Sequence, residues 1–350
     1  MAKKCKEVSL LEGAFNAADL LRERFRALSY AVPGIIPEGL TLFLAAPKLG
    51  KSWFVLGVAL ALSAGTPALG GIPTSAAPVL YLALEDGKRR LQSRLRSLGA
   101  FSPSAKLQFI ITADRDQILD TIHEFIAQHS GQNPLVILDT LGKVMPGQER
   151  GETLYDRDYR IGAALKRITD DYPGSAILVV HHTRKAEVSD FAEASSGTNG
   201  LTGAADTIIL LKRNRQESTA TLHVTSRDAK EGEYELNFGN NGVWSLSGGS
   251  LNAAAQAAES TAQIANLGDL SRDVIDFVLT AEDGVTAPDV AAALNISAAN
   301  ARVYLSRAAS ARRVHKLRRG VYGPFPDTSH LTIRVDFSKF PDGPSPRRTD

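Results

Sequence analysis

A glycine, a lysine and a serine at the junction of two apolar segments have the spacing needed to bind phosphate. Gly50, Lys51 and Ser52 lie between an apolar run at 40–46 and an apolar stretch at 53–62. A strand that passes through such a loop into a helix aims backbone N–H groups and the positive helix end at an anion. The lysine then reaches the β and γ phosphates, and the hydroxyl binds Mg²⁺. We predict a phosphate-binding loop.

The loop departs from the G-x-x-x-x-G-K-[ST] pattern at its first position, where Ala45 replaces the usual glycine. That position mainly requires a small residue at a turn, so the departure leaves the end of the motif that contacts phosphate unchanged. ATP and Mg²⁺ are the predicted cofactors. The predicted nucleotide-binding residues are Ala45, Pro47, Lys48, Gly50, Lys51 and Ser52.

Two acidic residues follow apolar runs elsewhere in the chain. Asp139 ends the run at 135–139, and Glu85 follows the run at 79–84. The carboxyl ends of parallel strands meet at one edge of a sheet, which would bring both acids to the phosphate loop. There Asp139 would hold the Mg²⁺ shell together with Ser52, and Glu85 would polarise the attacking water. The alternative is that Glu85 or Asp86 caps the following helix.

The elements that must position these residues follow an α/β pattern. Consecutive apolar positions, typical of strands buried on both faces, occur at 40–46, 79–84, 107–112, 135–139 and 176–182. Amphipathic segments lie between them, which predicts a mostly parallel sheet flanked by helices. After Asp206 the runs are separated by short polar links, which predicts antiparallel strands closing the edge of the sheet.

Composition and charge narrow the class of protein. Hydrophobic residues make up 43% and charged residues 22% of the 350 residues, typical of a folded protein. The only cysteine, Cys5, excludes an internal disulfide and a cysteine-based zinc site. The longest apolar stretch is about ten residues, whereas a membrane helix needs roughly 20. With no signal-peptide pattern at the start, we expect a cytoplasmic protein without a membrane partner.

Several stretches between residues 33 and 238 carry a family resemblance, namely AAPKLGKSW, VLYLALEDGKRRLQSRL, LVILDTLGKV, ILVVHHTRK and SSGTNGLTGAADTIILLKR. In this order they resemble the core of RecA-like P-loop ATPases, and most closely the RepA-like hexameric replicative helicases of plasmids and phages. The resemblance implies that Glu85 is the catalytic base. It also implies a polar sensor of the γ-phosphate after the next strand, which His182 or its neighbour His181 would supply.

The resemblance further implies a homo-oligomer, with a hexamer favoured, in which a neighbouring subunit donates an arginine finger to each nucleotide. Arg227 is favoured, although only half of the family's Lys-x-Arg pair is present, since Thr225 occupies the first place. Arg213 is the alternative. The long loops at 142–156 and 183–200 would face the central channel and contact single-stranded DNA, with Arg184 and Lys185 among the available charges. The alternative is that they are ordinary solvated loops.

The predicted organisation is an N-terminal segment at 1–29, a RecA-like ATPase domain at 30–246, a linker at 247–268, a winged helix-turn-helix domain at 269–325 and a polar tail at 326–350. The linker, rich in small residues, could be partly helical through its alanines. In the small domain, a turn at 295–297 would precede a third helix that enters the major groove of duplex DNA. The predicted DNA-binding residues there are Asn300, Arg302, Arg307, Arg318 and Arg319.

The charge distribution favours DNA binding over the alternative of a protein-docking module. The whole chain has a formal net charge of only +2, yet seven Lys or Arg and no Asp or Glu lie between Asn300 and Gly320. The sequence therefore predicts an ATP-dependent DNA motor, specifically a replicative ring helicase of a plasmid, phage or integrated element. The alternatives are a RecA-type recombination or repair ATPase and an ATP-dependent DNA-binding regulator that does not unwind DNA.

Overall fold

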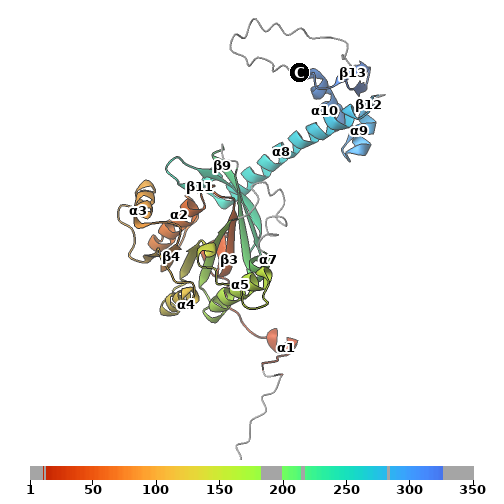
Figure 1. Ribbon diagram of the computed structural model, residues 1–350. Coiled ribbons are helices and arrows are strands. Elements are labelled where there is room, and N and C mark those ends of the chain that lie inside the picture. The colour runs from red at the N-terminus through yellow and green to blue at the C-terminus, as the bar shows by residue number, and fades with distance from the viewer. Residues whose placement is uncertain (1–10, 12, 183–198, 214–216, 282–283, 326–350) are drawn as a thin grey trace, which may run out of the picture. The chain divides into compact units, whose positions relative to one another are not determined.

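The computed structural model describes residues 11, 13–182, 199–213, 217–281 and 284–325, without the side chains of His182 and residues 263–269. The chain forms two compact units, Met1–Ser260 and Thr261–Asp350. In the first unit a nine-stranded sheet has the order β11-β10-β9-β8-β3-β7-β6-β4-β5 (Figure 1). The strands of this sheet are β3 (Gly39–Ala45), β4 (Val79–Ala83), β5 (Leu107–Ile110), β6 (Leu135–Asp139), β7 (Ala176–His182), β8 (Thr207–Lys212), β9 (Thr219–Ser226), β10 (Gly232–Phe238) and β11 (Trp244–Leu246).

Helices cover both faces of this sheet. They are α2 (Lys51–Ala64), α3 (Lys88–Ser97), α4 (Ile118–Gln128), α5 (Leu154–Asp171) and α7 (Asn199–Ala204). Short elements complete the unit: α1 (Ala17–Leu20), the hairpin of β1 (Tyr30–Val32) and β2 (Ile36–Pro37), and the 3₁₀ turns η1 (Leu141–Lys143) and η2 (Ser247–Gly249). Because the central strands are buried on both faces, their side chains feed two separate cores.

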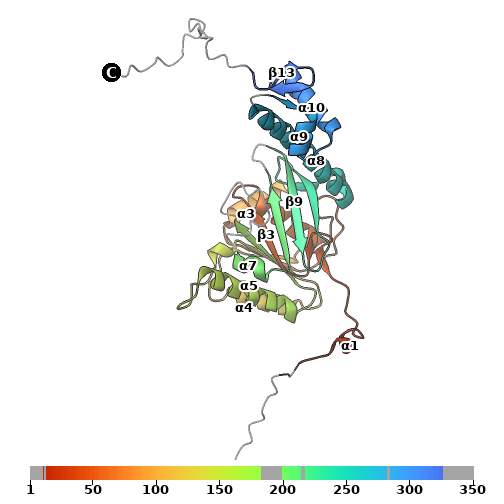
Figure 2. The same cartoon turned by 90° about the vertical axis from the view of Figure 1, so that its right-hand side faces the viewer.

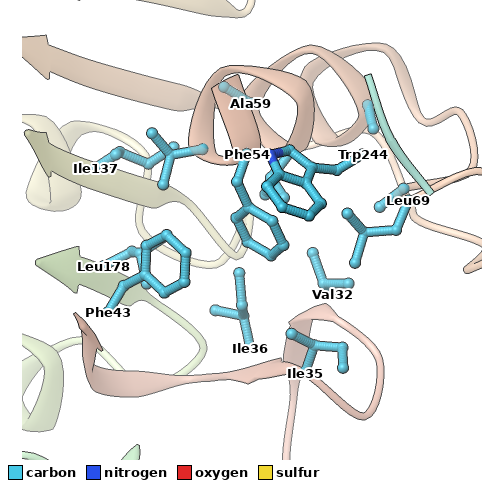
Figure 3. Close-up of a cluster of buried hydrophobic side chains, with 14 of the residues drawn as sticks. Val32, Ile35, Ile36, Phe43, Phe54, Ala59, Leu69, Ile137, Leu178 and Trp244 are labelled. Carbon is cyan, nitrogen blue, oxygen red and sulfur yellow. The ribbon is translucent and has the colours of Figure 1, made fainter. Parts of the chain in front are cut away.

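One core lies between the sheet and α2, where Phe43 of β3 stacks on Phe54 of α2 at 4.8 Å between ring centroids (Figure 3). The second core lies on the opposite face and joins the sheet to α4 and α5 through residues such as Ile122 and Leu165. The alternation of side chains along β3 sends Phe43 to the first core and Leu42 to the second. This double burial explains the continuous apolar runs in the sequence and fixes where each strand ends.

The structure confirms the predicted α/β class with its mostly parallel sheet, and it corrects two details. First, β8 is parallel to β3, so the antiparallel part begins only at β9. The short helix α7 supplies the crossover that lets β8 run parallel to β3. Second, most of the expected linker at 247–268 belongs to one helix, α8 (Leu251–Leu279). Its alanines favour helix strongly.

The second unit contains the rest of α8, then β12 (Val285–Thr286), α9 (Ala287–Ala293), α10 (Ala298–Ser310), β13 (His315–Arg318) and β14 (Val321–Gly323). Its three strands pair in the order β12-β14-β13 (Figure 2). A small core forms around Val274, Val290 and Leu305. The element order agrees with the predicted three helices followed by a hairpin, with β12 as an addition.

No helix within the described part of the chain has the length and apolar character needed to cross a membrane.

Candidate nucleotide-binding site

The phosphate loop connects β3 to α2, as the sequence predicts. Lys51 begins α2, and Gly50 precedes it in a left-handed conformation with φ +96°. The Lys51 ammonium donates hydrogen bonds of 2.8 Å to the carbonyl oxygens of Ala45 and Ala46. The lysine therefore lies across its own loop, which is where a phosphate would compete for it.

Burial perturbs this lysine. Only 5% of Lys51 is exposed, and desolvation lowers its pKa to about 8, against the opposing effect of the Asp139 and Glu85 carboxylates. The chain thus supplies acidic groups close enough to favour the ammonium, although it bonds to backbone carbonyls. A bound phosphate anion would provide further negative charge and raise this pKa again.

Asp139 ends β6 beside the loop and is 3% exposed. Its Oδ2 accepts a hydrogen bond of 2.7 Å from the Tyr81 hydroxyl. Burial raises the pKa of Asp139, while hydrogen bonds from Tyr81 and Ser52 act in the opposite direction. Carboxylate and hydroxyl oxygens are the donors that Mg²⁺ prefers, so Asp139 and Ser52 fit the predicted ion chemically.

Glu85 lies next to this pair because Ala83 of β4 is in register with Asp139 of β6. The Thr140 hydroxyl donates a 3.0 Å hydrogen bond to Glu85 Oε1, and the Asp139–Thr140 peptide bond is cis. Neither Glu85 nor Asp86 caps the following helix: its N-cap is Gly87, without a side-chain hydrogen bond. The helix-cap alternative for these two acids is therefore wrong.

Asp86 has a different environment from Glu85. Its side chain is 4% exposed and forms ion pairs with Arg90, at 3.1 Å, and with Arg94, both on α3. The Arg94 guanidinium also lies 5.4 Å from the centroid of the Trp53 ring. Asp86 is thus neutralised within the chain, whereas Glu85 lines the pocket beside the loop.

These groups line a pocket of about 440 Å³. Its lining residues are Pro47, Lys48, Gly50, Lys51, Ser52, Trp53, Glu85, Arg94 and Phe238. Trp53, Arg94 and Phe238 are not among the residues predicted from the sequence. Trp53 directly follows the motif, which could have indicated it, but no local signal connects Arg94 or Phe238 to the loop.

Two distant strands support the loop from behind. The Trp244 indole on β11 donates a 3.1 Å hydrogen bond to the Gly50 carbonyl, and the Phe238 ring lies 4.6 Å from the Trp244 ring. The Arg213 guanidinium lies 4.4 Å from the Phe238 ring centroid. A Cβ at Gly50 would approach the Trp244 ring to 3.1 Å. Packing as well as the positive φ therefore favours glycine there.

The two arginine-finger candidates lie at opposite edges of the sheet. Arg213 follows β8 at the edge of its own phosphate loop, since Ala45 pairs with Leu211. Arg227 follows β9 at the other edge and donates a 2.9 Å hydrogen bond to the Gly203 carbonyl. His182, in register with Ala45, ends β7 at the phosphate-loop edge. Arg184 and Lys185 lie outside the described residues.

In the second unit, Ser297 caps α10 by accepting a hydrogen bond from the backbone N–H of Asn300. The predicted DNA-binding residues that the structure describes there are all exposed: Asn300, Arg302, Arg307, Arg318 and Arg319. The first three lie on α10, while Arg318 ends β13 and Arg319 follows it. Helix and hairpin therefore both carry accessible polar or basic side chains.

The parallel sheet, the phosphate loop after β3 and the acids after β4 and β6 define a RecA-like P-loop ATPase. A family model described as an AAA domain matches residues 8–188, just over half of the chain. The chain belongs to this AAA domain family and is an ATP-hydrolysing enzyme.

Solved structures with similar folds include one described as an isolated ATPase domain, at 16% identity and a TM-score of 0.47, with 60% of this chain and 84% of that one covered. A DnaB-like replicative helicase, solved in a study of its interactions with primase, has 17% identity and a TM-score of 0.45, over 59% and 57%. A KaiC-like protein of Pyrococcus horikoshii has 13% identity and a TM-score of 0.42, over 64% and 98%. A comparison with curated proteins gives no match.

Proposed function

We propose that the chain is an ATP-dependent DNA motor, a ring helicase that acts in the replication of a plasmid, phage or integrated element in the cytoplasm. The observation that carries the proposal is the separation of Arg227 from the rest of the site. Lys51, Asp139 and Glu85 meet at one edge of the sheet, whereas Arg227 follows a strand end at the other. A ring of identical subunits would bring the Arg227 of one copy to the phosphate loop of the next.

Within one subunit, Lys51 would bind the β and γ phosphates of ATP, and Ser52 and Asp139 would hold Mg²⁺. The ion would neutralise charge on the phosphate oxygens. Glu85, fixed by Thr140, would orient the attacking water and accept its proton. His182, at the end of β7, would couple the γ-phosphate to the loop that follows.

Arg227 is the better candidate for the arginine finger. The Arg213 guanidinium already stacks on Phe238 and lies 5.7 Å from the Trp244 ring centroid, beside the loop of its own subunit. Arg227 is exposed, and its guanidinium donates to the Gly203 carbonyl. It can therefore exchange that carbonyl for a neighbour's phosphate without disturbing a core.

DNA would bind at two places. Single-stranded DNA would pass through the ring of a hexamer and contact the loop that carries Arg184 and Lys185. The second unit, as a winged helix-turn-helix, would bind duplex DNA through Asn300 and Arg302 at the start of α10, with Arg307, Arg318 and Arg319 contacting phosphates. The exposure of these described side chains supports this assignment.

The test is strand separation of a forked DNA substrate with and without ATP. We expect unwinding only with ATP and Mg²⁺, and stimulation of ATP hydrolysis by single-stranded DNA. Glu85→Gln should bind ATP without turning it over, whereas Glu124→Gln, which changes an exposed acid on α4, should behave like the wild type. ATP hydrolysis that is indifferent to DNA would contradict the motor.

The basic surface of the second unit keeps a regulator as the second candidate. A protein that binds a specific duplex and leaves the fork intact would favour this regulator. Filaments on DNA in electron micrographs, in place of closed rings, would favour the recombination or repair ATPase.

A further inference from the structure

A buried tyrosine contacts the acid that we assign to the metal site. Tyr81 on β4 is fully buried, and its hydroxyl donates to Asp139 Oδ2 at 2.7 Å. Strand register explains the contact: Tyr81 pairs with Ile137, and Ala83 pairs with Asp139. Tyr81 and Asp139 therefore lie on the same face of the sheet as diagonal neighbours on adjacent strands.

Packing fixes the position of this hydroxyl. On the other side of β4, Phe109 of β5 is in register with Tyr81, and the two ring centroids are 5.7 Å apart. The ring is therefore held within one rigid sheet. A hydroxyl held in this way defines the rotation of the carboxylate that accepts from it.

A carboxylate has two oxygens, and a site for a divalent cation needs one of them in a set direction. With Oδ2 occupied by Tyr81, the remaining acceptor capacity of Asp139 is directed to Ser52 and the loop. We propose that Tyr81 is a positioning residue for Mg²⁺ binding: it orients Asp139 without contacting the nucleotide or the ion. Partners that orient metal ligands typically affect metal affinity by about 10–100-fold.

This inference rests on the proposed function, because it assumes that Asp139 holds Mg²⁺. The test measures metal binding directly. Full-length wild type, Tyr81→Phe, Asp139→Asn and the double variant are saturated with a non-hydrolysable ATP analogue. They are then titrated with Mn²⁺, and the free ion is followed by electron paramagnetic resonance. Tyr234→Phe is the matched control, since it removes the hydroxyl of another largely buried tyrosine in the same sheet.

We expect Tyr81→Phe to weaken Mn²⁺ binding about tenfold, while analogue binding without metal changes less than about twofold and Tyr234→Phe matches the wild type. Because Tyr81 acts through Asp139, the double variant should bind Mn²⁺ no more weakly than Asp139→Asn alone. Wild-type Mn²⁺ affinity in Tyr81→Phe overturns the proposal, as does a full additive loss in the double variant.

Stability provides a second readout. Removing the hydroxyl leaves a buried carboxylate with one donor fewer, so Tyr81→Phe should melt at a lower temperature than the wild type. The double variant carries no charge at position 139 and should recover that loss. If Tyr81→Phe does not fold, recovery in the double variant still identifies Asp139 as its partner, and a lack of recovery overturns the proposal. If Asp139→Asn itself binds Mn²⁺ normally, the assigned metal site fails, and this outcome is distinct from a failure of Tyr81 alone.

Discussion

Two buried aspartates occupy opposite edges of the same sheet and differ in how the chain neutralises them. Asp206 lies at the edge where β3 begins: its Oδ2 accepts from the Leu40 N–H at 2.9 Å, and its Oδ1 accepts from the Lys166 ammonium at 2.7 Å. Asp139 lies at the other edge and accepts from the uncharged hydroxyls of Tyr81 and Ser52, while the neighbouring Lys51 bonds to backbone carbonyls.

The difference shows that burial of an acid does not by itself indicate function. Both residues are less than 9% exposed. Asp206 has a cation and a backbone donor of its own and fits tightly, since a Cβ at Gly39 would lie 2.7 Å from its Oδ2. Within the described part of the chain, Asp139 has no directly bonded cation, and it lies next to a pocket. An acid that the chain buries in this way is the one prepared for an external cation.

The largest expected effect is the loss of turnover in Asp139→Asn. We expect ATP hydrolysis to fall about a hundredfold or more, because the carboxylate that would hold the metal is gone. Thermal stability should stay the same or rise, since the variant removes a buried charge that hydroxyl groups alone solvate. Steady-state hydrolysis and thermal melting test this pair of results, and a large loss of stability would make Asp139 a scaffold residue like Asp206.

Asp206→Asn should show the opposite pattern. It removes the charge that pairs with Lys166, so we expect the free energy of unfolding to fall by about 2–4 kcal/mol. Turnover per folded molecule should remain within about threefold of the wild type at low temperature, because the site lies at the other edge. Urea unfolding and hydrolysis on the same preparation test this, with Asp170→Asn as a control that removes only the exposed partner of Lys166. A large loss of turnover in stably folded Asp206→Asn would erase the distinction between the two acids.

A smaller effect is expected from pH, through Lys51. Its pKa of about 8 lies below the ordinary 10.5, so the folded protein loses this proton before the unfolded chain does. Stability without nucleotide should therefore rise between about pH 8 and 10.5 from this group. Phosphate favours the ammonium, so ATP affinity should fall as pH rises above about 8, by up to about tenfold per unit.

Calorimetry at a pH just above this value, in buffers of different ionisation enthalpy, should detect proton uptake on ATP binding. Equal heats in all buffers would show that Lys51 remains charged without nucleotide, and the phosphate-loop edge would then be as fully neutralised as the Asp206 edge.

The sequence predicts those parts of the site that follow local rules. Lys51, Ser52, Glu85 and Asp139 each lie where an element begins or ends, and the carboxyl-edge rule for parallel strands brings them together. Tyr81 could not be assigned, since a tyrosine inside an apolar run indicates core until the register places it diagonally to Asp139.

Long-range packing and short elements account for the rest. Trp244 reaches Gly50 across 194 residues of chain, and Phe238 reaches the same loop from a neighbouring strand, so no local pattern connects them to it. The parallel direction of β8 is not evident from the sequence because α7, its crossover, is too short to give a helical period.

Trp53 and Trp244 are the only tryptophans in the sequence, and both contact the phosphate loop. All indole emission of the protein therefore originates beside one short segment. The unlabelled protein is in effect an optical probe of its own loop: Trp53 senses what enters the pocket, and Trp244 senses whether the Gly50 peptide moves. Replacing either with phenylalanine would separate the arrival of a ligand from the response of the loop in a single stopped-flow trace.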